Sequence, residues 1–289
     1  MTKEEKIANR LIDDAELLQD MGFEVVAVFL QGSQNYGLDY EGSDIDTKAI
    51  VLPQFKDMVT GVSPVSTTHI LPSEEHIDIK DIRMMFDVWK RQNINFLELL
   101  YTPYVWINDK YQDIMSKLYE RRDDIAHANP VTLMKCIYGV MDQKYHALTH
   151  PYPACAEEIE KYGYASKQLH HLLRGKQFMQ RIAAGENFGD ALIANDKEYL
   201  ISVKANPGMY TLDEAQKIAD DTMTWAKKFV KDYSLKNSLT DLINYITDSP
   251  QIEEQLFADV LTKALRTYWE GEWQAERDCQ EIGIEFCEK

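Results

Sequence analysis

The sequence predicts an α+β fold, in which a β-sheet with flanking helices is followed by an all-helical C-terminal region. Three short runs of residues have the character of β-strands, and all of them lie before residue 80. From about Pro130 onward, helical periodicity dominates to the end of the chain. The length of 289 residues suits two domains, because a domain usually holds about 100 to 200 residues. We therefore expect a first domain over residues 1–125 and a helical second domain over residues 126–289.

The chain begins with the signature of a helix. Thr2 and Glu5 have the spacing of a capping box, in which each side chain bonds the backbone N–H of the other residue. Apolar residues then recur at helical intervals until Gly22, where we expect the helix to end. The next run, Val25 to Leu30, is wholly apolar and too short for a helix. It predicts a central strand, buried on both faces, that stops at Gly32.

Two more strands are expected before the first long helix of the sheet region. Asp44 to Leu52 alternates at first and then becomes wholly apolar, which predicts a second strand. The segment from Pro53 to Pro72 is expected to be irregular. Polar and apolar residues alternate over Glu75–Ile79, which predicts a third strand. The periodicity from Ile82 to Leu100 predicts a helix.

Proline-containing breaks separate the predicted helices of the second half. They lie at His150–Pro153, at Asn206–Gly208 and at Ser249–Pro250. Thr211 and Glu214 repeat the capping-box spacing, so a helix is expected to begin there.

Two further features are expected to be structural rather than catalytic. Glu98 stands among leucines, and if it is buried we expect it to form a salt bridge with Arg83 or Arg91. Trp269 and Trp273 are four residues apart on a predicted terminal helix, and we expect them to pack in a core or an interface.

The chain is acidic along its whole length. Its 48 Asp and Glu residues against 31 Lys and Arg give a net charge of −17, of which residues 1–145 carry −9 and residues 146–289 carry −8. Such a chain is a poor general binder of nucleic acids or anionic membranes, because phosphate groups are held by Lys and Arg. The four cysteines lack metal-site spacing, and no apolar run is long enough for a signal peptide or a membrane span. We expect a cytoplasmic protein with reduced thiols that does not contact membranes.

The residues best suited to chemistry are Gly32-Ser33 and, after ten intervening residues, Asp44-Ile45-Asp46. Two carboxylates at i and i+2 of a strand point to the same face and can converge on a cation that takes oxygen ligands. Gly32 allows a close backbone approach and Ser33 adds a hydroxyl, which suits a phosphate oxygen. Asp78, on the third predicted strand, would add a third carboxylate, and three can hold two metal ions for phosphoryl displacement. Each piece alone is more often structural, but their ordered combination is specific.

Residues 161–185 interrupt the acidity, since they contain no Asp or Glu but hold five Lys or Arg and two His. On a helix, one face would carry Lys167, His171, Arg174, Phe178 and Arg181. A charged face of this kind is normally only solvated. A triphosphate bound near carboxylates needs positive charge from another segment, however, and this face could supply it.

These motifs resemble the active-site signature of the DNA polymerase β superfamily of nucleotidyltransferases, through Gly32-Ser33-x-x-Tyr36-Gly37 followed by Ser43-Asp44-x-Asp46. More narrowly, the chain resembles the predicted nucleotidyltransferase family assigned to an RNA repair pathway, over about residues 24–230. The further stretches that carry this resemblance are Asn93–Leu100, Lys161–Arg174 and Gly208–Glu214. The resemblance implies a mixed sheet that carries the carboxylates, a helical region that closes over the nucleotide, and magnesium. Ile94 departs from the family, which usually has proline there.

The leading hypothesis is a metal-dependent enzyme that transfers a nucleoside monophosphate from an NTP, ATP included, to an acceptor hydroxyl with release of pyrophosphate. Asp44 and Asp46 would bind two Mg²⁺ ions, with Mn²⁺ as an alternative, and Asp78 would bind one of them and orient or deprotonate the acceptor. Its neighbours Glu74, Glu75 and Asp81 are alternatives for the third carboxylate.

The remaining predicted contacts concern the triphosphate. Gly32 and Ser33 would contact the β- and γ-phosphates, and Lys167, His171 and Arg174 would neutralise charge on the triphosphate. The acceptor is left open between a short RNA terminus, a small molecule and a protein, and so is the oligomeric state. The alternative function is a catalytically silent nucleotide-binding or interaction module of the same fold.

Overall fold

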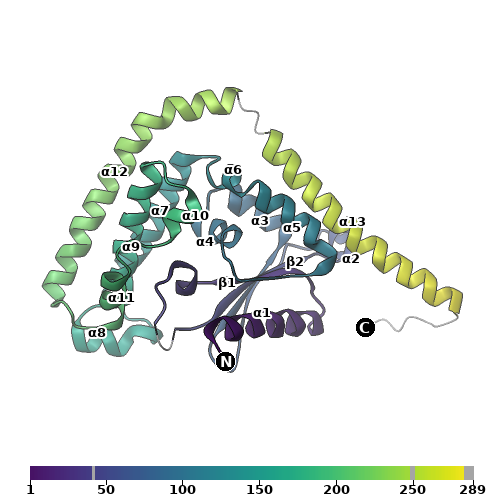
Figure 1. Cartoon of the computed structure of the whole chain (residues 1–289), viewed down its shortest axis with the longest axis horizontal. Helices are drawn as coiled ribbons and strands as arrows, with labels where there is room; N and C mark the ends of the chain where they lie inside the picture. The colour runs from purple at the N-terminus through teal and green to yellow at the C-terminus, as the bar shows by residue number, and fades with distance from the viewer. Residues whose placement is uncertain (41–42, 248–250, 283–289) are drawn as a thin grey trace.

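The computed structural model describes residues 1–40, 43–247 and 251–282. A five-stranded sheet lies in the first half of the chain, and helices make up the second half (Figure 1). The strands are β1 (Glu24–Gln31), β2 (Asp46–Leu52), β3 (Ser66–Ile70), β4 (His76–Asp81) and β5 (Val105–Ile107). This arrangement confirms the predicted α+β class with its helical C-terminal region.

The sheet is mixed, with strand order β3-β4-β2-β1-β5. β1 runs antiparallel to β2 and to β5, whereas β2 runs parallel to β4. Every residue of β1 from Val25 to Leu30 is buried, as its apolar sequence predicts for an interior strand. Because β1 and β2 are antiparallel, the end of β1 lies beside the start of β2, and Gln31 pairs with Asp46.

Helix α1 (Lys3–Asp20) covers one face of the sheet and lies beneath it in Figure 1. The predicted capping box is present, since the Thr2 hydroxyl accepts from Glu5 N and the Glu5 carboxylate accepts from Thr2 N. The apolar stripe of α1 packs on residues that point to the same face of β1, β2 and β4. This smaller core consists of Ile7, Leu11, Ala15, Leu18, Val25, Val28, Leu30, Ala49, Val51, Ile77 and Ile79.

A larger core covers the other face and continues through the helical half of the chain. Its helices from the sheet region are α3 (Ile82–Lys90), α4 (Ile94–Leu97), α5 (Gln112–Glu120) and α6 (Arg122–Ala126). The helices that follow are α7 (Pro130–His146), α8 (Ala156–Tyr162), α9 (Ser166–Ala183), α10 (Phe188–Leu192), α11 (Lys197–Ala205), α12 (Leu212–Thr247) and α13 (Gln251–Ile282). The division into residues 1–125 and 126–289 stays a prediction, and the two parts share this core.

Two sequence-based expectations about the sheet region are wrong, and one strand was not predicted. The segment Pro53–Pro72 is not irregular, because it contains helix α2 (Phe55–Thr60) and the edge strand β3. The short edge strand β5 was not expected. The helix predicted over Ile82–Leu100 is broken after α3, where Gln92 has a φ of 54° and the chain turns into α4 and a 3₁₀ turn at Glu98–Leu100. A left-handed residue cannot continue a right-handed helix.

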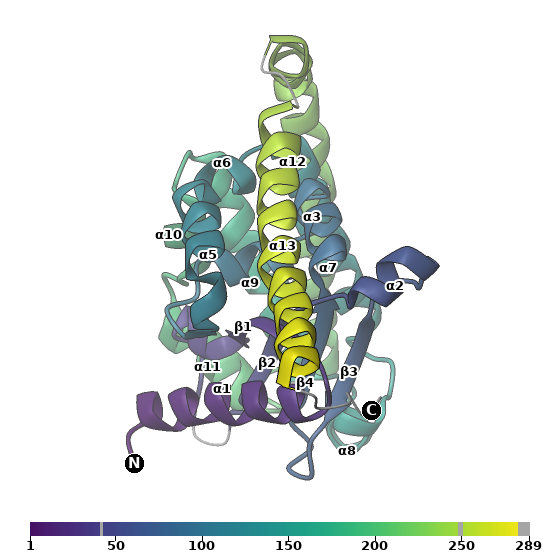
Figure 2. The same ribbon diagram turned by 90° about the vertical axis from the view of Figure 1, so that its right-hand side faces the viewer.

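The two longest helices frame the molecule. α12 begins at the predicted capping box, where Thr211 and Glu214 exchange hydrogen bonds. The predicted break at Ser249–Pro250 lies outside the described residues. α13 runs across α3 and α5, in front of them in Figure 2. Trp269 and Trp273 of α13 pack edge-on against Phe55 of α2, with ring centroids 5.0 and 5.4 Å apart.

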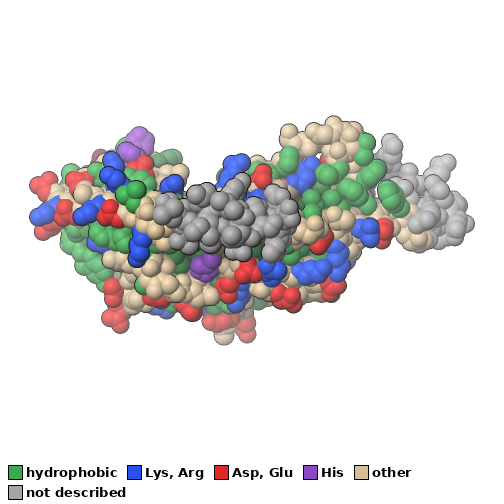
Figure 3. Space-filling model, turned by 90° about the horizontal axis from the view of Figure 1, so that it is seen from above, with side chains coloured by type: hydrophobic (Ala, Val, Ile, Leu, Met, Phe, Trp, Pro, Cys, Tyr) green, Lys and Arg blue, Asp and Glu red, His purple; other side chains and the backbone are tan. Residues whose placement is uncertain are grey.

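Hydrophobic side chains are exposed where α2 and α13 meet, to the right of the centre of the view in Figure 3. Phe55 is 38% exposed, Val59 68% and Trp273 47%. Within the described ranges, no helix is both long and apolar enough to cross a membrane.

We predict that Phe257→Ala destabilises the protein by about 3 to 5 kcal/mol, the usual range for removing a buried aromatic side chain. Phe257 is 3% exposed and stacks on Phe86 with ring centroids 4.7 Å apart, so its loss leaves a cavity between α13 and α3. Urea unfolding followed by circular dichroism measures the change. Val59→Ala, at a side chain that is 68% exposed, is the matched control. Equal stability of the two variants would show that α13 does not pack on the core as described.

Candidate active site

A tight turn follows β1 and presents Ser33 at the end of the strand. Gly32 has φ 104° and ψ −156°, a conformation that only glycine adopts readily. A 3₁₀ turn, Ser33–Tyr36, comes next and ends at Gly37 in the left-handed region. Asn35 donates to the carbonyl oxygen of Leu30 at 2.9 Å, which ties the turn to the strand. The predicted Gly-Ser pair therefore lies in a turn held against the sheet.

The carboxylates Asp44 and Asp46 lie directly beside this turn. β2 starts at Asp46, so Asp46 is on the strand, whereas Asp44 precedes it and is exposed. The side-chain amide of Gln34 donates to the carbonyl oxygen of Asp44 at 2.7 Å. Asp46 Oδ1 accepts from the backbone N–H of His76 at 3.0 Å. The turn and the carboxylate segment thus form one connected unit.

Charged residues on the side of the sheet that α1 covers form hydrogen bonds with this unit. The carboxylate of Glu75 accepts from the backbone N–H of Ile45 at 2.9 Å, between the two aspartates. Arg10 bonds both Glu75 and Asp14, and Asp14 in turn accepts from the Thr47 hydroxyl at 2.6 Å. Burial raises the pKa of Asp14, although its bonds to Thr47 and Arg10 oppose the rise. Glu75 is thereby engaged in positioning the backbone.

Asp78 lies on β4 beside Lys48 of β2, on the same face of the sheet as Asp46. Its two oxygens are paired with lysines, Oδ2 with Lys48 Nζ at 2.8 Å and Oδ1 with Lys80 Nζ at 2.9 Å. Burial raises the pKa of Asp78, but the two lysines outweigh it and the net pKa is lowered. Lys48 also lies 4.5 Å from the centroid of the Phe96 ring. Asp78 is therefore an ionised carboxylate with both oxygens engaged.

The donors suit a divalent metal ion in part. Asp44 is exposed and the side chain of Asp46 is 39% exposed, and carboxylate oxygens are the ligands that Mg²⁺ prefers. Among the residues the structure describes, no group of three or more His, Cys, Asp or Glu side chains is arranged to hold a metal. Asp44 and Asp46 remain a predicted pair of ligands, and Asp78 does not join them in the arrangement described.

Arg174 of α9 packs on the glycine-serine turn through Tyr36. Its guanidinium carbon is 3.4 Å from the centroid of the Tyr36 ring, and the Tyr36 hydroxyl donates to the carboxylate of Glu98. Burial raises the pKa of Glu98 to about 8, although Arg174 opposes the rise. Burial also lowers the pKa of Arg174 to about 10, against the effect of Glu98. These three residues connect α9, the turn and the segment after α4.

The expected partner of Glu98 was therefore wrong. Arg83 pairs with Asp81, with Arg83 Nη2 2.6 Å from Asp81 Oδ2, and Glu98 instead contacts Tyr36 beside Arg174. The same pair engages Asp81, one of the alternatives for the third carboxylate, and its side chain is buried.

Three lysines from different helices lie near one another. They are Lys144 of α7, Lys167 of α9 and Lys204 of α11. Burial lowers the pKa of Lys144 and of Lys204, and the charge of Lys167 lowers both further. Asp44 and Asp39 act on Lys204 in the opposite direction, so this lysine faces the carboxylate segment. Its Nζ is 4.7 Å from the centroid of the Tyr40 ring.

The predicted cationic face of α9 is only partly placed at the site. Lys167, His171 and Arg174 lie in this region, but Phe178 is buried in the core. Arg181 points elsewhere, with its Nη2 2.6 Å from the carboxylate of Glu186. Burial is the main reason that the pKa of His171 is well below its usual value, and His170 and Lys144 lower it further. His171 is therefore neutral at pH 7 and offers hydrogen bonds rather than charge.

Sequence reasoning missed Lys144 and Lys204. Each is a single lysine on a helix without an unusual charge pattern, and only the packing of α7 and α11 against α9 brings them to Lys167. Tyr36 was noted only as part of a motif, and its contact with Arg174 was not foreseen.

Comparison with known proteins identifies a family and solved structures of similar fold. The model of the RNA repair pathway DNA polymerase beta family matches residues 7–180, which include the turn, the three aspartates, Glu98 and Arg174. No curated protein matches the chain significantly. A solved structure of a nucleotidyltransferase-like protein from Exiguobacterium sibiricum 255-15 is similar at 8% identity, over 86% of each chain, with a TM-score of 0.31.

We predict that Glu98→Gln removes part of the pH dependence of stability. The folded state keeps the Glu98 proton up to a pKa of about 8, against 4.5 for the free side chain. The contribution of protonated Glu98 to the free energy of unfolding is therefore complete below pH 4.5. It falls by up to about 1.4 kcal/mol per pH unit and is lost as the pH rises through 8. Urea unfolding between pH 5 and 9 should show wild type losing stability relative to Glu98→Gln as the pH rises. A constant difference between them would contradict a raised pKa, and exposed Glu120→Gln is the control.

Proposed function

This chain belongs to the RNA repair pathway DNA polymerase beta family, and from that membership we propose that it transfers a nucleoside monophosphate from an NTP to an acceptor hydroxyl, releasing pyrophosphate. Membership itself makes it a nucleotidyltransferase in general terms. The observation that carries the finer proposal is the placement of the Gly32-Ser33 turn and the Asp44 segment, joined by Gln34, opposite the lysine group that includes Lys204. Carboxylates that would hold a metal ion therefore lie near a lysine that would bind a triphosphate.

The chain's own residues would bind and orient the triphosphate. Gly32 and Ser33 would contact the β- and γ-phosphates through the backbone and the hydroxyl. Lys167 would contribute charge together with Lys144 and Lys204. His171 would donate a hydrogen bond as a neutral imidazole. The Nε of Arg174 is buried and has no partner within the described ranges, so it could donate a hydrogen bond to a phosphate oxygen. Positioning and charge stabilisation supply most of the rate in phosphoryl transfer.

Asp44 and Asp46 would hold a divalent cation, Mg²⁺ or Mn²⁺, which when bound neutralises charge on the phosphates. We propose Asp78 as the third carboxylate, and Lys48 and Lys80 must then release at least one of its oxygens. Its lowered pKa makes it a weak base at neutral pH, so it would orient the acceptor rather than take its proton.

The alternative is a nucleotide-binding module that transfers nothing. The observation in its favour is that lysines occupy both oxygens of Asp78. Binding of NTP without transfer to any acceptor would support it. The acceptor remains a short RNA terminus, a small molecule or a protein, and we place the reaction in the cytoplasm on the strength of the free thiols of Cys136 and Cys155.

We predict that Asp44→Asn combined with Asp46→Asn lowers transfer from α-labelled ATP by at least about 100-fold, because the cation loses its charged ligands. Labelled products are separated and identified by mass after incubation with Mg²⁺ and candidate acceptors. Asp13→Asn, an exposed change on α1, should retain full transfer. Undiminished transfer by the double variant would remove these aspartates from the site.

We predict that Lys204→Ala weakens NTP binding about 10-fold, the effect of losing one charge-assisted hydrogen bond. Calorimetric titration with a non-hydrolysable ATP analogue and Mg²⁺ measures the affinity. Lys227→Ala, at an exposed position on α12, should bind as tightly as wild type. If both variants bind equally well, the lysine group does not contact the triphosphate.

A further inference from the structure

Two acids and two lysines alternate on one face of the sheet beside the proposed site. Asp46 and Lys48 are two residues apart on β2, and Asp78 and Lys80 are two residues apart on β4. Side chains two residues apart on a strand point to the same face. The parallel register of these strands places Lys48 directly beside Asp78. Asp46 and Asp78 are therefore diagonal neighbours, and Lys48 adjoins both of them.

Lys48 is a buried lysine. It is 5% exposed, and a lysine is rarely buried to this extent unless its charge is paired. Its Nζ is 2.8 Å from Asp78 Oδ2 and 4.5 Å from the centroid of the Phe96 ring. Burial lowers the pKa of Lys48, and the charge of Asp78 opposes that effect. The carboxylate and the aromatic face thus hold the amine against the sheet.

Lys80 holds the other oxygen of Asp78 from a more open position. Its Nζ is 2.9 Å from Asp78 Oδ1 and also donates to the hydroxyl of Ser66, on the edge strand β3, at 2.8 Å. The side chain of Lys80 is 17% exposed, against 7% for Lys48. An ion pair near the surface contributes little, whereas breaking a buried pair leaves an unpaired charge. Lys80 can therefore leave Asp78 more readily than Lys48.

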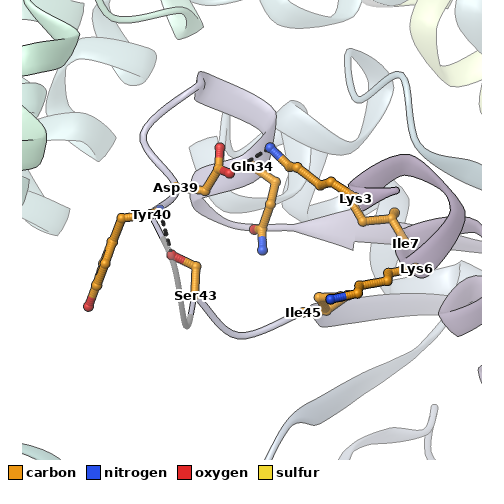
Figure 4. A pocket seen from close by; sticks show the side chains of 8 residues that line it. All are labelled: Lys3, Lys6, Ile7, Gln34, Asp39, Tyr40, Ser43 and Ile45. Atoms are coloured by element: carbon orange, nitrogen blue, oxygen red, sulfur yellow. Dashed lines mark hydrogen bonds and ion pairs between the residues drawn. The ribbon is translucent and has the colours of Figure 1, made fainter. Parts of the chain in front are cut away.

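Another acid, in the same segment as Asp44, lies on the α1 side of the sheet. Figure 4 shows the cavity of about 370 Å³ between α1 and the segment after the glycine-serine turn, with Asp39 in its wall. Asp39 is paired there with Lys3 of α1, whose Nζ is 2.6 Å from Asp39 Oδ2. Asp78 points to the opposite face, since its neighbours on β4 pack in the core that α1 covers. A second metal ion on the face of Asp46 would therefore depend on Asp78.

A second metal ion at Asp78 would have to share its place with Lys48. Displacing the amine from Asp78 would leave it buried without a carboxylate, which is strongly unfavourable. Leaving the amine in place would put a divalent ion beside an ammonium group, and like charges repel strongly where water is excluded. The contacts of Lys48 therefore oppose the binding of a second ion.

From these contacts, and resting on the proposed function, we propose that Lys48 takes the place of the second metal ion of a two-metal site. Lys48 keeps Asp78 Oδ2 during transfer, and its ammonium group supplies there the positive charge that a second ion would supply. One divalent ion binds at Asp44 and Asp46, and Lys80 releases Asp78 Oδ1 so that this oxygen orients the acceptor. Lys48 acts through Asp78, so it is a positioning residue.

Counting bound Mn²⁺ tests this proposal without turnover. The full-length protein is titrated with Mn²⁺ alone in about 0.15 M KCl, which screens weak binding to the acidic surface. Electron paramagnetic resonance measures the free ion, and the bound ion is obtained by difference. Lys48→Met removes the charge but keeps an unbranched side chain, and Lys48→Arg keeps the charge. Lys80→Met is the matched control, because it removes the other lysine from the same carboxylate.

We expect one Mn²⁺ per chain in wild type, in Lys48→Arg and in Lys80→Met, and two in Lys48→Met. The second ion should be lost when Asp78→Asn is added to Lys48→Met, which assigns that ion to Asp78. Two ions in wild type would overturn the proposal, and so would a single ion in Lys48→Met that circular dichroism shows to be folded. The wild-type count tests the proposal even if Lys48→Met does not fold.

A further variant, Asp44→Asn combined with Asp46→Asn, reports on the proposed function instead. It should lose the Mn²⁺ that wild type binds. Retention of that ion would place the metal elsewhere and contradict the proposed function. The gain of an ion in Lys48→Met, and its loss with Asp78→Asn, reports on Lys48 alone.

Discussion

The arrangement of the site depends on one buried contact, the packing of the Arg174 guanidinium on the Tyr36 ring beside Glu98. Tyr36 belongs to the turn after β1, Glu98 follows α4, and Arg174 is in α9, so the contact joins segments that are distant in the sequence. A buried charge is tolerated only where nearby groups compensate it. The aromatic face of Tyr36 provides part of that compensation, and the contact fixes how α9 lies against the turn. Because α7 and α11 pack on α9, this contact also determines where Lys144 and Lys204 lie.

Negative and positive side chains of the proposed site come from different parts of the fold, an arrangement that would suit an anion bound together with a metal ion. The carboxylates belong to the sheet, and the network of Arg10, Asp14 and Glu75 holds their backbone from the α1 side. The lysines belong to the helices, and burial together with the charge of Lys167 lowers the pKa of Lys144 and of Lys204. An anion bound among them would relieve that repulsion. The net negative charge of the chain is thus offset locally by these lysines.

Local sequence patterns predicted the elements that are determined by residues close together in the sequence. The capping boxes at Thr2 and Thr211 and the buried strand β1 are examples. Strand β3 escaped notice because its side chains are almost all exposed, so no alternation marks it. The break of the helix at Gln92 also leaves no mark in the spacing of the apolar residues. At the proposed site, the sequence pattern predicted that the Gly32-Ser33 turn and Asp46 belong together, and they do lie at neighbouring strand ends. The partner of Glu98 and the position of Lys204 depend on tertiary packing that periodicity does not encode.

We propose that an NTP binds between the Gly32-Ser33 turn with its aspartates and the lysines of the helical half. A crystal structure with a non-hydrolysable ATP analogue and Mn²⁺ tests it most directly, since the anomalous signal of Mn²⁺ locates the metal independently of the nucleotide. The account predicts Mn²⁺ at the carboxylates of Asp44 and Asp46, with the phosphates between Ser33 and Lys204. Nucleotide or Mn²⁺ bound elsewhere on the protein, with Asp44 and Asp46 free of metal, would contradict it.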